Sequence, residues 1–374
     1  MLAGGKLALP EGLVSGGWLT VSDGLISGVG TGTPPPGDRF DLAGALVVPG
    51  FVDTHCHGGG GGSFSSGEVK EAVGAIAAHR RHGTTTLVAS LVSEPIRTLV
   101  NQEAVLRELV EDGELAGIHL EGPFLAEARC GAHDPAVLRE PDAATIDALL
   151  RAGRGAVRMV TIAPELTGGV RAVRRLVDAG VIAALGHTDG TEEQIRPAID
   201  AGATVGTHLF NGMRPLHHRE PGPIGALLDD ERVTVELICD LVHVHPTMVR
   251  LAARLAGRGR TVLITDAMSA TDAADGRYHL GRLEVDVRDG VATLAETGSL
   301  AGSTLTMDVA FRNLVQVVGL SIPDAVRATS SRPAELIGVD DRTGSLRQGL
   351  AADLVVLDDD LRPVRVLRRG ERVV

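Results

Sequence analysis

The chain has 374 residues and a formal net charge of −12, with only 2% aromatic residues. A chain of this length can bury one large hydrophobic core and a small second one. The acidic balance without a basic stripe argues against nucleic acid or an anionic membrane as a partner. The sequence has no apolar run of about eighteen residues, which argues against a membrane span.

The N-terminal segment and the cysteines bear on the compartment. MLAGGKLALPEG lacks the charged start and long apolar stretch of a signal peptide. The three cysteines, Cys56, Cys130 and Cys239, are too few and odd in number for a disulfide framework. We therefore expect a cytoplasmic protein.

The two ends of the chain share one pattern. Residues 1–48 and 341–374 both read as short strands separated by turns, unlike the middle of the chain. We therefore expect the two ends to pair into one small β-sandwich domain.

Residues 49–340 alternate between strand-like runs and helical stretches whose apolar residues recur at helical spacing. Eight such β–α units predict an α/β fold, a TIM-like (β/α)8 barrel. Residues 276–298 indicate a hairpin inserted after the eighth strand. The eight expected strands lie in 44–57, 84–90, 115–123, 156–164, 180–187, 203–210, 234–244 and 261–268.

A His-x-His pair ends the first expected strand. Residues two apart on a strand point to the same side, so His55 and His57 can hold one metal ion at the barrel mouth. Cys56 then points the other way, as a small buried hydrophobe. The glycines at 58–62 permit close approach of the backbone to a ligand. The alternative is a flexible loop with two exposed histidines.

Three further ligand-type residues, Glu121, His187 and His208, each end an expected strand. Barrel enzymes present catalytic side chains at these strand ends. Alone, a histidine there is usually a core residue and a glutamate usually caps the next element. Together with the His-x-His pair they indicate a metal site, because neutral imidazoles are common metal ligands.

Asp266 ends the eighth expected strand, in VLITD. A carboxylate beside a metal-activated water can take the proton of the attacking water and pass it to a leaving nitrogen. The alternative is an N-cap of the following segment.

The lysine count limits how two metals could be bridged. Some two-metal barrels use a carboxylated lysine at the end of the fourth strand. This chain has only Lys6 and Lys70, both earlier than that strand. Glu121 is therefore the candidate bridge.

The segment 211–225 (NGMRPLHHREPGPIG) is basic in an otherwise acidic protein. Such a loop suits a phosphate or carboxylate on the substrate, assisted by the backbone amides of Asn211 and Gly212. The alternative is a solvated basic turn. The basic side chains are Arg214, His217, His218 and Arg219, and we expect His243 and His245 to add donors toward the same mouth.

A loop after Glu121 carries His133 and Cys130, and it is a possible lid over the substrate, with Cys130 as a plain loop thiol. GVGTGT at 28–33 has the letters of a dinucleotide-binding loop. PPPG follows it, so no helix can begin there and we reject that reading.

Several blocks together are similar to one known family. The chain resembles the N-acetylglucosamine-6-phosphate deacetylases of the amidohydrolase superfamily over its whole length. The resemblance implies hydrolysis of the acetamide at C2 of the sugar phosphate, giving glucosamine 6-phosphate and acetate. The blocks are PGFVDTHCHG, GIHLEGPFL, LGHTDGT, THLFNGM with HHREPG, ICDLVHVHP, LITDAMSA and LAGSTLTMDVAFRN.

The resemblance also implies roles for particular residues. Arg219 matches an arginine that reaches the phosphate in the neighbouring subunit's site, which implies a homodimer. The remaining matches are Glu121, His187 and His208 to the metal site, Asp266 to the general acid/base, His133 to the histidine that polarises the acetamide carbonyl, and Asn211, Gly212 and His243 to sugar-phosphate contacts.

Both histidines of the His-x-His pair, which some family members lack, are present here. We therefore expect two divalent metals per subunit, bridged by Glu121. Zinc suits these ligands, and iron, cobalt or manganese could also occupy the site.

Two rival functions stay open at this point. One is another amidohydrolase, acting on an N-acyl amino acid or a cyclic amide. The other is a metal-binding structural or sensor protein, which would need neither Asp266 nor the basic loop.

Overall fold

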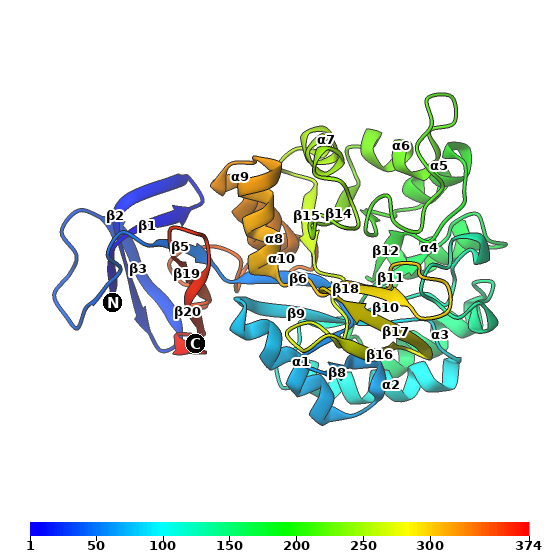
Figure 1. Ribbon diagram of the computed structural model, residues 1–374, viewed down its shortest axis with the longest axis horizontal. Helices are drawn as coiled ribbons and strands as arrows, with labels where there is room; N and C mark the ends of the chain where they lie inside the picture. The colour runs from blue at the N-terminus through cyan, green and yellow to red at the C-terminus, as the bar shows by residue number, and fades with distance from the viewer. Residues whose placement is uncertain (374) are drawn as a thin grey trace.

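The computed structural model describes residues 1–373 and shows a parallel barrel beside a smaller β domain (Figure 1). The predicted fold class, a TIM-like barrel with a second β domain, is confirmed. Eight parallel strands form the barrel sheet. In chain order they are β6 (Phe51–Cys56), β9 (Thr84–Leu91), β10 (Gly117–Glu121), β11 (Val157–Ile162), β12 (Ile182–Leu185), β13 (Val205–Gly206), β14 (Thr234–Ile238) and β15 (Thr261–Ile264).

The first and last barrel strands meet and nearly close the sheet. Cys56 and Ala267 form a parallel bridge, and the Asp266 amide donates to the His55 carbonyl at 2.9 Å. This closure brings the residues after β15 beside those at the end of β6.

Helices surround the barrel because each has an apolar face that the strands cover. In α4, Val173 and Leu176 are buried while Arg174 and Arg175 face outward. The helices are α1 (Val69–Arg81), α2 (Ile96–Glu111), α3 (Ala143–Gly153), α4 (Gly169–Asp178), α5 (Glu192–Asp200), α6 (Gly222–Asp229), α7 (Pro246–Ala256), α8 (Met307–Asn313), α9 (Ile322–Val326) and α10 (Arg332–Leu336). Shorter turns and strands are η1 (Phe64–Ser66), η2 (Glu127–Arg129), η3 (Pro135–Val137), η4 (Leu314–Val318), η5 (Arg327–Ser331), β7 (Gly58–Gly59) and β8 (Gly62–Ser63).

The smaller domain is one eight-stranded sheet built from both ends of the chain, around a core that includes Leu7, Leu19 and Val356. Strand β5 of the N-terminal part pairs antiparallel with β19 of the C-terminal part, and Figure 1 shows both termini in this domain. Its strands are β1 (Leu2–Leu9), β2 (Gly12–Ser22), β3 (Leu25–Thr31), β4 (Phe40–Asp41), β5 (Leu46–Pro49), β19 (Leu354–Leu357), β20 (Pro363–Arg368) and β21 (Glu371–Arg372).

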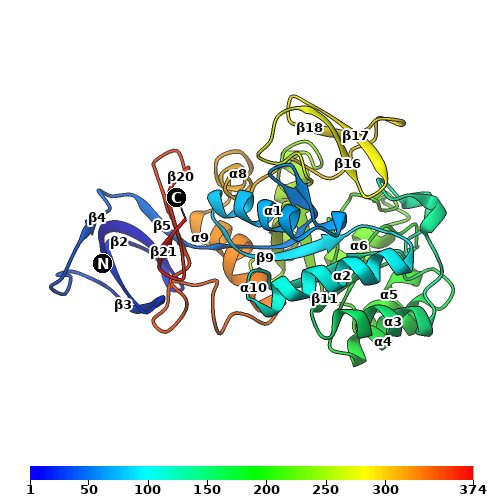
Figure 2. The same cartoon turned by 90° about the horizontal axis from the view of Figure 1, so that it is seen from below.

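The insertion after the eighth barrel strand has three strands, one more than the hairpin expected there. These are β16 (Gly276–Leu280), β17 (Leu283–Arg288) and β18 (Val291–Leu294). The third strand forms because Asp289 and Gly290, both at positive φ, turn the chain back onto β17. Figure 2 shows the insertion projecting from one side of the barrel.

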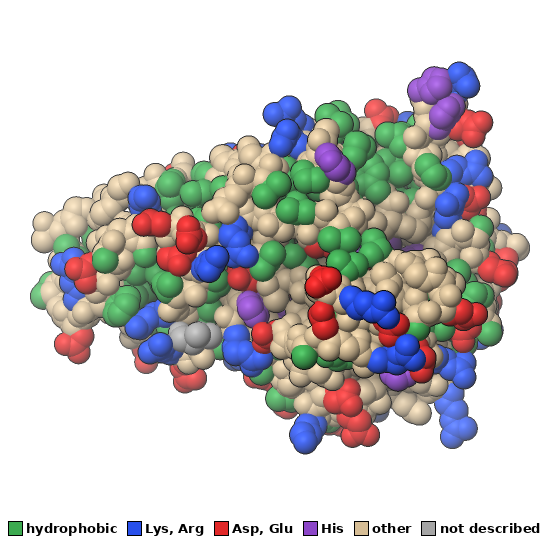
Figure 3. Space-filling view, viewed as in Figure 1, with side chains coloured by type: hydrophobic (Ala, Val, Ile, Leu, Met, Phe, Trp, Pro, Cys, Tyr) green, Lys and Arg blue, Asp and Glu red, His purple; other side chains and the backbone are tan. Residues whose placement is uncertain are grey.

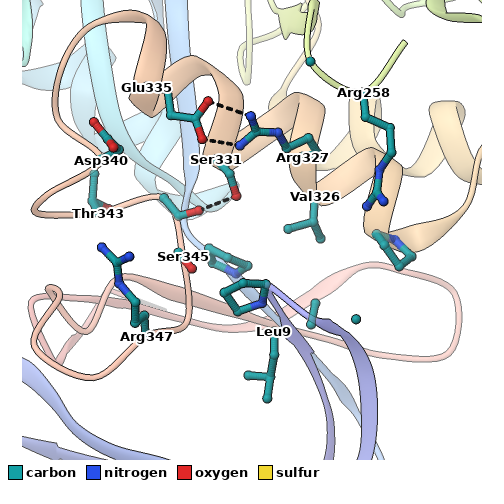
Figure 4. Close-up of a pocket in the computed structure, with 17 residues that line it drawn as sticks. Leu9, Arg258, Val326, Arg327, Ser331, Glu335, Asp340, Thr343, Ser345 and Arg347 are labelled. Atoms are coloured by element: carbon teal, nitrogen blue, oxygen red, sulfur yellow. Dashed lines mark hydrogen bonds and ion pairs between the residues drawn. The ribbon is translucent and has the colours of Figure 1, made fainter.

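A cavity of about 540 Å³ lies at the junction of the two domains, lined by residues such as Leu9, Val326 and Arg347 (Figure 4). Figure 4 shows the guanidinium of Arg327 paired with Glu335. Arg258 is likewise paired, with Asp324 at 2.6 Å. Because these charges already have partners, the cavity offers few free groups to a ligand, and it shares no lining residue with the site described next.

Within residues 1–373, no helix combines the length and the apolar character needed to cross a membrane.

Candidate metal centre and active site

The His-x-His pair and Asp266 form one cluster at the barrel mouth. The Nε2 atoms of His55 and His57 are 3.1 Å apart. Asp266 Oδ1 lies 3.5 Å from His55 Nε2 and 3.2 Å from His57 Nε2. All three side chains are buried, so their polar atoms face one another and not bulk solvent.

A second cluster faces the first across Glu121. The Nε2 atoms of His187 and His208 are also 3.1 Å apart. Glu121 Oε1 lies 3.1 Å from His187 Nε2 and 2.8 Å from His208 Nε2. Its other oxygen, Oε2, lies 3.2 Å from His57 Nε2. One carboxylate thus presents an oxygen to each cluster.

The backbone turns sharply at three of these residues. His187, His208 and Asp266 have φ values of 48°, 29° and 51°. Residues other than glycine adopt positive φ rarely, and such strain clusters at functional sites. Here it ends each strand and directs the side chain into the mouth of the barrel.

The hydrogen-bond partners identify which ring nitrogen carries the proton. His187 Nδ1 lies 2.7 Å from the Arg129 carbonyl oxygen, which only accepts, so Nδ1 is the donor. His55 Nδ1 faces the buried carboxylate of Glu236 at 3.4 Å and donates in the same way. The Nε2 atoms of His55 and His187 therefore present lone pairs toward the oxygens of Glu121.

The imidazole lone pairs and the carboxylate oxygens that face one another repel unless cations lie between them. Two imidazole nitrogens about 3 Å apart cannot both point a proton at the other. Nitrogen and oxygen donors of this kind are the ligands of zinc and related divalent metals. The residues present therefore fit a metal centre, and this structure supports the metal-binding character expected from the sequence.

His133 is protonated at the opposite nitrogen. Its Nδ1 accepts the backbone N–H of Ser93 at 3.1 Å. Its Nε2 therefore carries the hydrogen and points toward Glu121 Oε2, 3.3 Å away. Burial lowers the pKa of His133 to about 4, which keeps the ring neutral. This geometry suits a hydrogen-bond donor to a substrate better than a metal ligand.

The backbone of Asp266 is fixed from both sides. Its carbonyl accepts the Ser303 amide at 2.7 Å, and its neighbour Thr265 donates to Asp53 at 2.6 Å. Burial opposes charge on Asp266, but positive charge on His55 and His57 would hold its pKa below its usual range, and metal cations held by the same nitrogens would act in the same direction. The carboxylate is therefore held ionised next to the two histidines.

The cavity above the clusters has a volume of about 150 Å³. Asn211, Gly212 and His243 line it on the side of strands β13 and β14. A Cβ on Gly212 would lie 2.8 Å from His187 Nδ1, so only glycine fits there. Burial opposes protonation of His243, but its hydrogen bond to Asp240 raises its pKa, which favours a cationic donor at the rim.

The basic loop does not fold over its own subunit's cavity. His217, His218 and Arg219 are exposed, and none of them lines the cavity. Figure 3 shows histidine and basic side chains projecting together at an edge of the molecule. Arg214 is instead paired with Asp189 at 3.2 Å. The loop therefore presents its tip outward.

Two expectations about neighbouring residues need correction or detail. His245 does not face the mouth, because its Nδ1 accepts the Thr247 amide and caps α7. Cys130 is half-buried next to Gly131, which lines the cavity, but Cys130 itself does not line it.

Sequence reasoning missed two residues that hold the histidines. Glu236, a wholly buried carboxylate, receives His55 Nδ1–H and the Thr54 hydroxyl at 3.2 Å. An acidic residue inside the apolar run TVELI was the available signal. Ser93 sets the tautomer of His133 through its backbone amide, which no side-chain pattern reveals.

A parallel barrel with converging histidines and carboxylates at the carboxyl ends of its strands is the arrangement found in metal-dependent hydrolases. The chain belongs to the amidohydrolase family, whose model matches residues 46–373.

Relatives and solved structures resemble the chain over nearly its whole length. It is 38% identical to N-acetylgalactosamine-6-phosphate deacetylase of Escherichia coli O157:H7, with 87% of each chain covered. It is 36% identical to N-acetylglucosamine-6-phosphate deacetylase of Bos taurus, covering 90% of this chain and 85% of the other. The resemblance inferred from the motifs is thereby confirmed.

Among solved structures, a mutant N-acetyl-D-glucosamine-6-phosphate deacetylase of Mycobacterium smegmatis in complex with N-acetyl-D-glucosamine-6-phosphate superposes with a TM-score of 0.97 at 50% identity, covering 100% of this chain and 98% of the other. The enzyme of Thermotoga maritima gives a TM-score of 0.90 at 32% identity, covering 100% and 99%. An enamidase at 17% identity, with a TM-score of 0.63, shares the fold alone.

Proposed function

We propose that this chain hydrolyses the acetamide of N-acetyl-D-glucosamine 6-phosphate to D-glucosamine 6-phosphate and acetate. The observation that carries the proposal is Glu121, whose two oxygens face two separate histidine clusters beside Asp266. The names and whole-length similarity of the relatives support the choice of sugar phosphate. The rival substrates, N-acyl amino acids and cyclic amides, have no comparable support.

We infer two divalent cations per subunit. His55, His57 and Asp266 would hold one, His187 and His208 the other, and Glu121 would bridge them. Zinc suits these ligands best, with iron, cobalt or manganese as alternatives. Such cations supply Lewis acidity and make hydroxide available near neutral pH.

The protein's own groups would then move the proton and stabilise charge. Asp266 accepts the proton of the attacking water and delivers it to the leaving nitrogen. The Nε2–H of His133 donates to the acetamide oxygen as negative charge develops there. Since Ser93 holds the His133 ring, and backbone hydrogen bonds to His55 and Ser303 hold Asp266, little reorganisation is needed during reaction.

The sugar phosphate would lie on the side of β13 and β14. Asn211, Gly212 and His243 line the cavity there and would contact the sugar and its phosphate. Arg219 is exposed at the tip of the basic loop, which suits a reach into the neighbouring subunit's site. We therefore propose a homodimer. The relatives, which are enzymes of sugar-phosphate metabolism by name, support the proposal of a cytoplasmic location.

Substrate selectivity tests this function. Acetate release would be measured on N-acetylglucosamine 6-phosphate, the unphosphorylated sugar and N-acetylgalactosamine 6-phosphate. We expect turnover largely confined to phosphorylated sugars, with the gluco epimer preferred. Equal turnover of phosphorylated and free sugar would remove the phosphate argument, and turnover of neither would favour the rival substrates.

A further inference from the structure

The active-site cavity has one apolar wall among otherwise polar surroundings. Of the side chains that line it, only Ala132, Leu280 and Leu300 are purely hydrocarbon. All three belong to segments outside the barrel strands: the loop that carries His133, the end of β16, and the chain that follows β18.

This wall and the polar side of the cavity come from different sectors of the barrel. Asn211 and Gly212 follow β13, and His243 follows β14. Leu280 and Leu300 come after β15, and Leu280 packs in one cluster with Val92, which follows β9. Because β15 and β9 flank β6 in the closed barrel, the apolar wall covers a sector that is distinct from the sugar-phosphate side.

The wall is packed against the chain that follows β9. A Cβ on Gly281 would meet Val92 Cγ2 at 2.7 Å, so the turn after Leu280 rests directly on Val92. Val92 immediately precedes Ser93, which fixes His133.

The acetamide carbon has three substituents in one plane. With its oxygen toward His133 and its nitrogen toward Asp266 and the sugar, the third substituent, the methyl group, must point away from both. In N-acetylglucosamine 6-phosphate the methyl group has no polar atom to satisfy, whereas a hydroxyl against this wall would lose its hydrogen bonds. The apolar wall is therefore chemically suited to the acyl group.

We propose that Ala132, Leu280 and Leu300 form an acyl-selecting wall that accepts the acetyl methyl group and rejects longer N-acyl chains. This inference rests on the proposed function and adds the residues that set its acyl specificity. Leu280 is itself buried in one apolar cluster with Val92 and Val285, which leaves little room behind the methyl group. One extra methylene in such a pocket typically changes kcat/KM by about 10- to 200-fold.

The test compares kcat/KM for N-acetyl- and N-propionyl-glucosamine 6-phosphate in metal-loaded wild type, Leu280→Ala and Leu300→Ala. Wild type is expected to prefer acetyl by about tenfold or more. Each variant is expected to reduce that ratio by about fivefold or more. Leu294→Ala is the matched control: it removes a leucine from the same apolar cluster without touching the cavity, and should keep the wild-type ratio.

A milder variant, Leu280→Val, should shift the ratio in the same direction by a smaller factor, and it serves as the test if Leu280→Ala does not fold. If the acetyl-to-propionyl ratio of kcat/KM is unchanged in the cavity variants, and kcat/KM falls equally for both substrates, the proposed acyl-selecting role is wrong. The leucines would then contact the sugar ring. Absence of acetate release by wild type would instead overturn the proposed function, so the two failures are distinguishable.

Discussion

At the scale of single residues, the proposed role of Asp266 in proton transfer can be tested directly by mutation. It is ionised, its backbone is fixed on both sides, and its carboxylate lies 3.2 Å from His57 Nε2. Asp266→Asn keeps the shape of the side chain but removes the base. We expect turnover to fall by about 10²- to 10⁴-fold, the usual contribution of general acid–base catalysis.

Steady-state kinetics would be measured together with metal content and thermal unfolding. The loss of turnover reports on proton transfer only if the asparagine variant keeps the fold and the metal content of the wild type. Wild-type turnover in Asp266→Asn would contradict the role given to this carboxylate.

At the scale of elements, helix α2 contains a buried carboxylate far outside the mechanism. Glu103 is wholly buried, and among residues 1–373 neither of its oxygens has a hydrogen-bond partner. Burial raises the pKa of Glu103 to about 8, so the folded state holds a proton that the unfolded state releases above about pH 4.5. The contribution of Glu103 to the free energy of unfolding is therefore most favourable at low pH, where the side chain is protonated in both states. This contribution is lost as pH rises from about 4.5 through 8.

Glu103→Gln should remove this dependence. Relative to wild type, its unfolding free energy should rise by up to about 1.4 kcal/mol per pH unit across that window. Urea unfolding at several pH values would measure it, with the exposed Glu108→Gln of the same helix as control. Parallel pH profiles for wild type and Glu103→Gln would show that Glu103 ionises normally.

Helices and strands were predictable from the sequence where the periodicity of apolar residues determines them. They were less predictable where the backbone is strained. The alternation of apolar runs located all eight barrel strands. However, the run at 203–210 yields only Val205–Gly206 as strand, because the chain turns at His208, and a positive φ at histidine has no sequence signature. The same limit applies to Ser93, which acts through its backbone.

The ligand-type residues were found because each ends an apolar run, a pattern that packing alone does not require. His245 broke this pattern by capping α7, since a proline at the first helical position makes its side chain the nearest acceptor for the Thr247 amide. Glu121 was expected as a bridge from the sequence, but which of its oxygens faces which cluster needed coordinates, because that depends on distances between strands that are remote in sequence.

At the scale of the whole molecule, the proposed dimer makes each site depend on two chains. Arg219 is exposed and does not line the active-site cavity of its own subunit. We expect Arg219→Ala to raise KM for the phosphorylated sugar by about tenfold or more, since a charge-assisted contact to phosphate is lost. Arg254→Ala, at an exposed arginine of α7, is the control.

Mixing two defective variants tests the shared site directly. In a mixed dimer, an Asp266→Asn subunit can lend its Arg219 to the intact chemistry of an Arg219→Ala subunit. The two variants would be mixed in equal amounts and allowed to exchange subunits. At low substrate concentration, the activity of this mixture should exceed the activity of the Arg219→Ala protein that it contains, measured alone. If the mixture is no more active than its Arg219→Ala protein alone, Arg219 does not act across the interface.

The most direct test of the central claim is acetate release from N-acetylglucosamine 6-phosphate before chelation, after chelation and after metal is added back. If the clusters around Glu121 hold the catalytic cations, activity will be lost on chelation and return with zinc or a related divalent ion, with about two equivalents bound per subunit. Full turnover by metal-free protein would contradict the account.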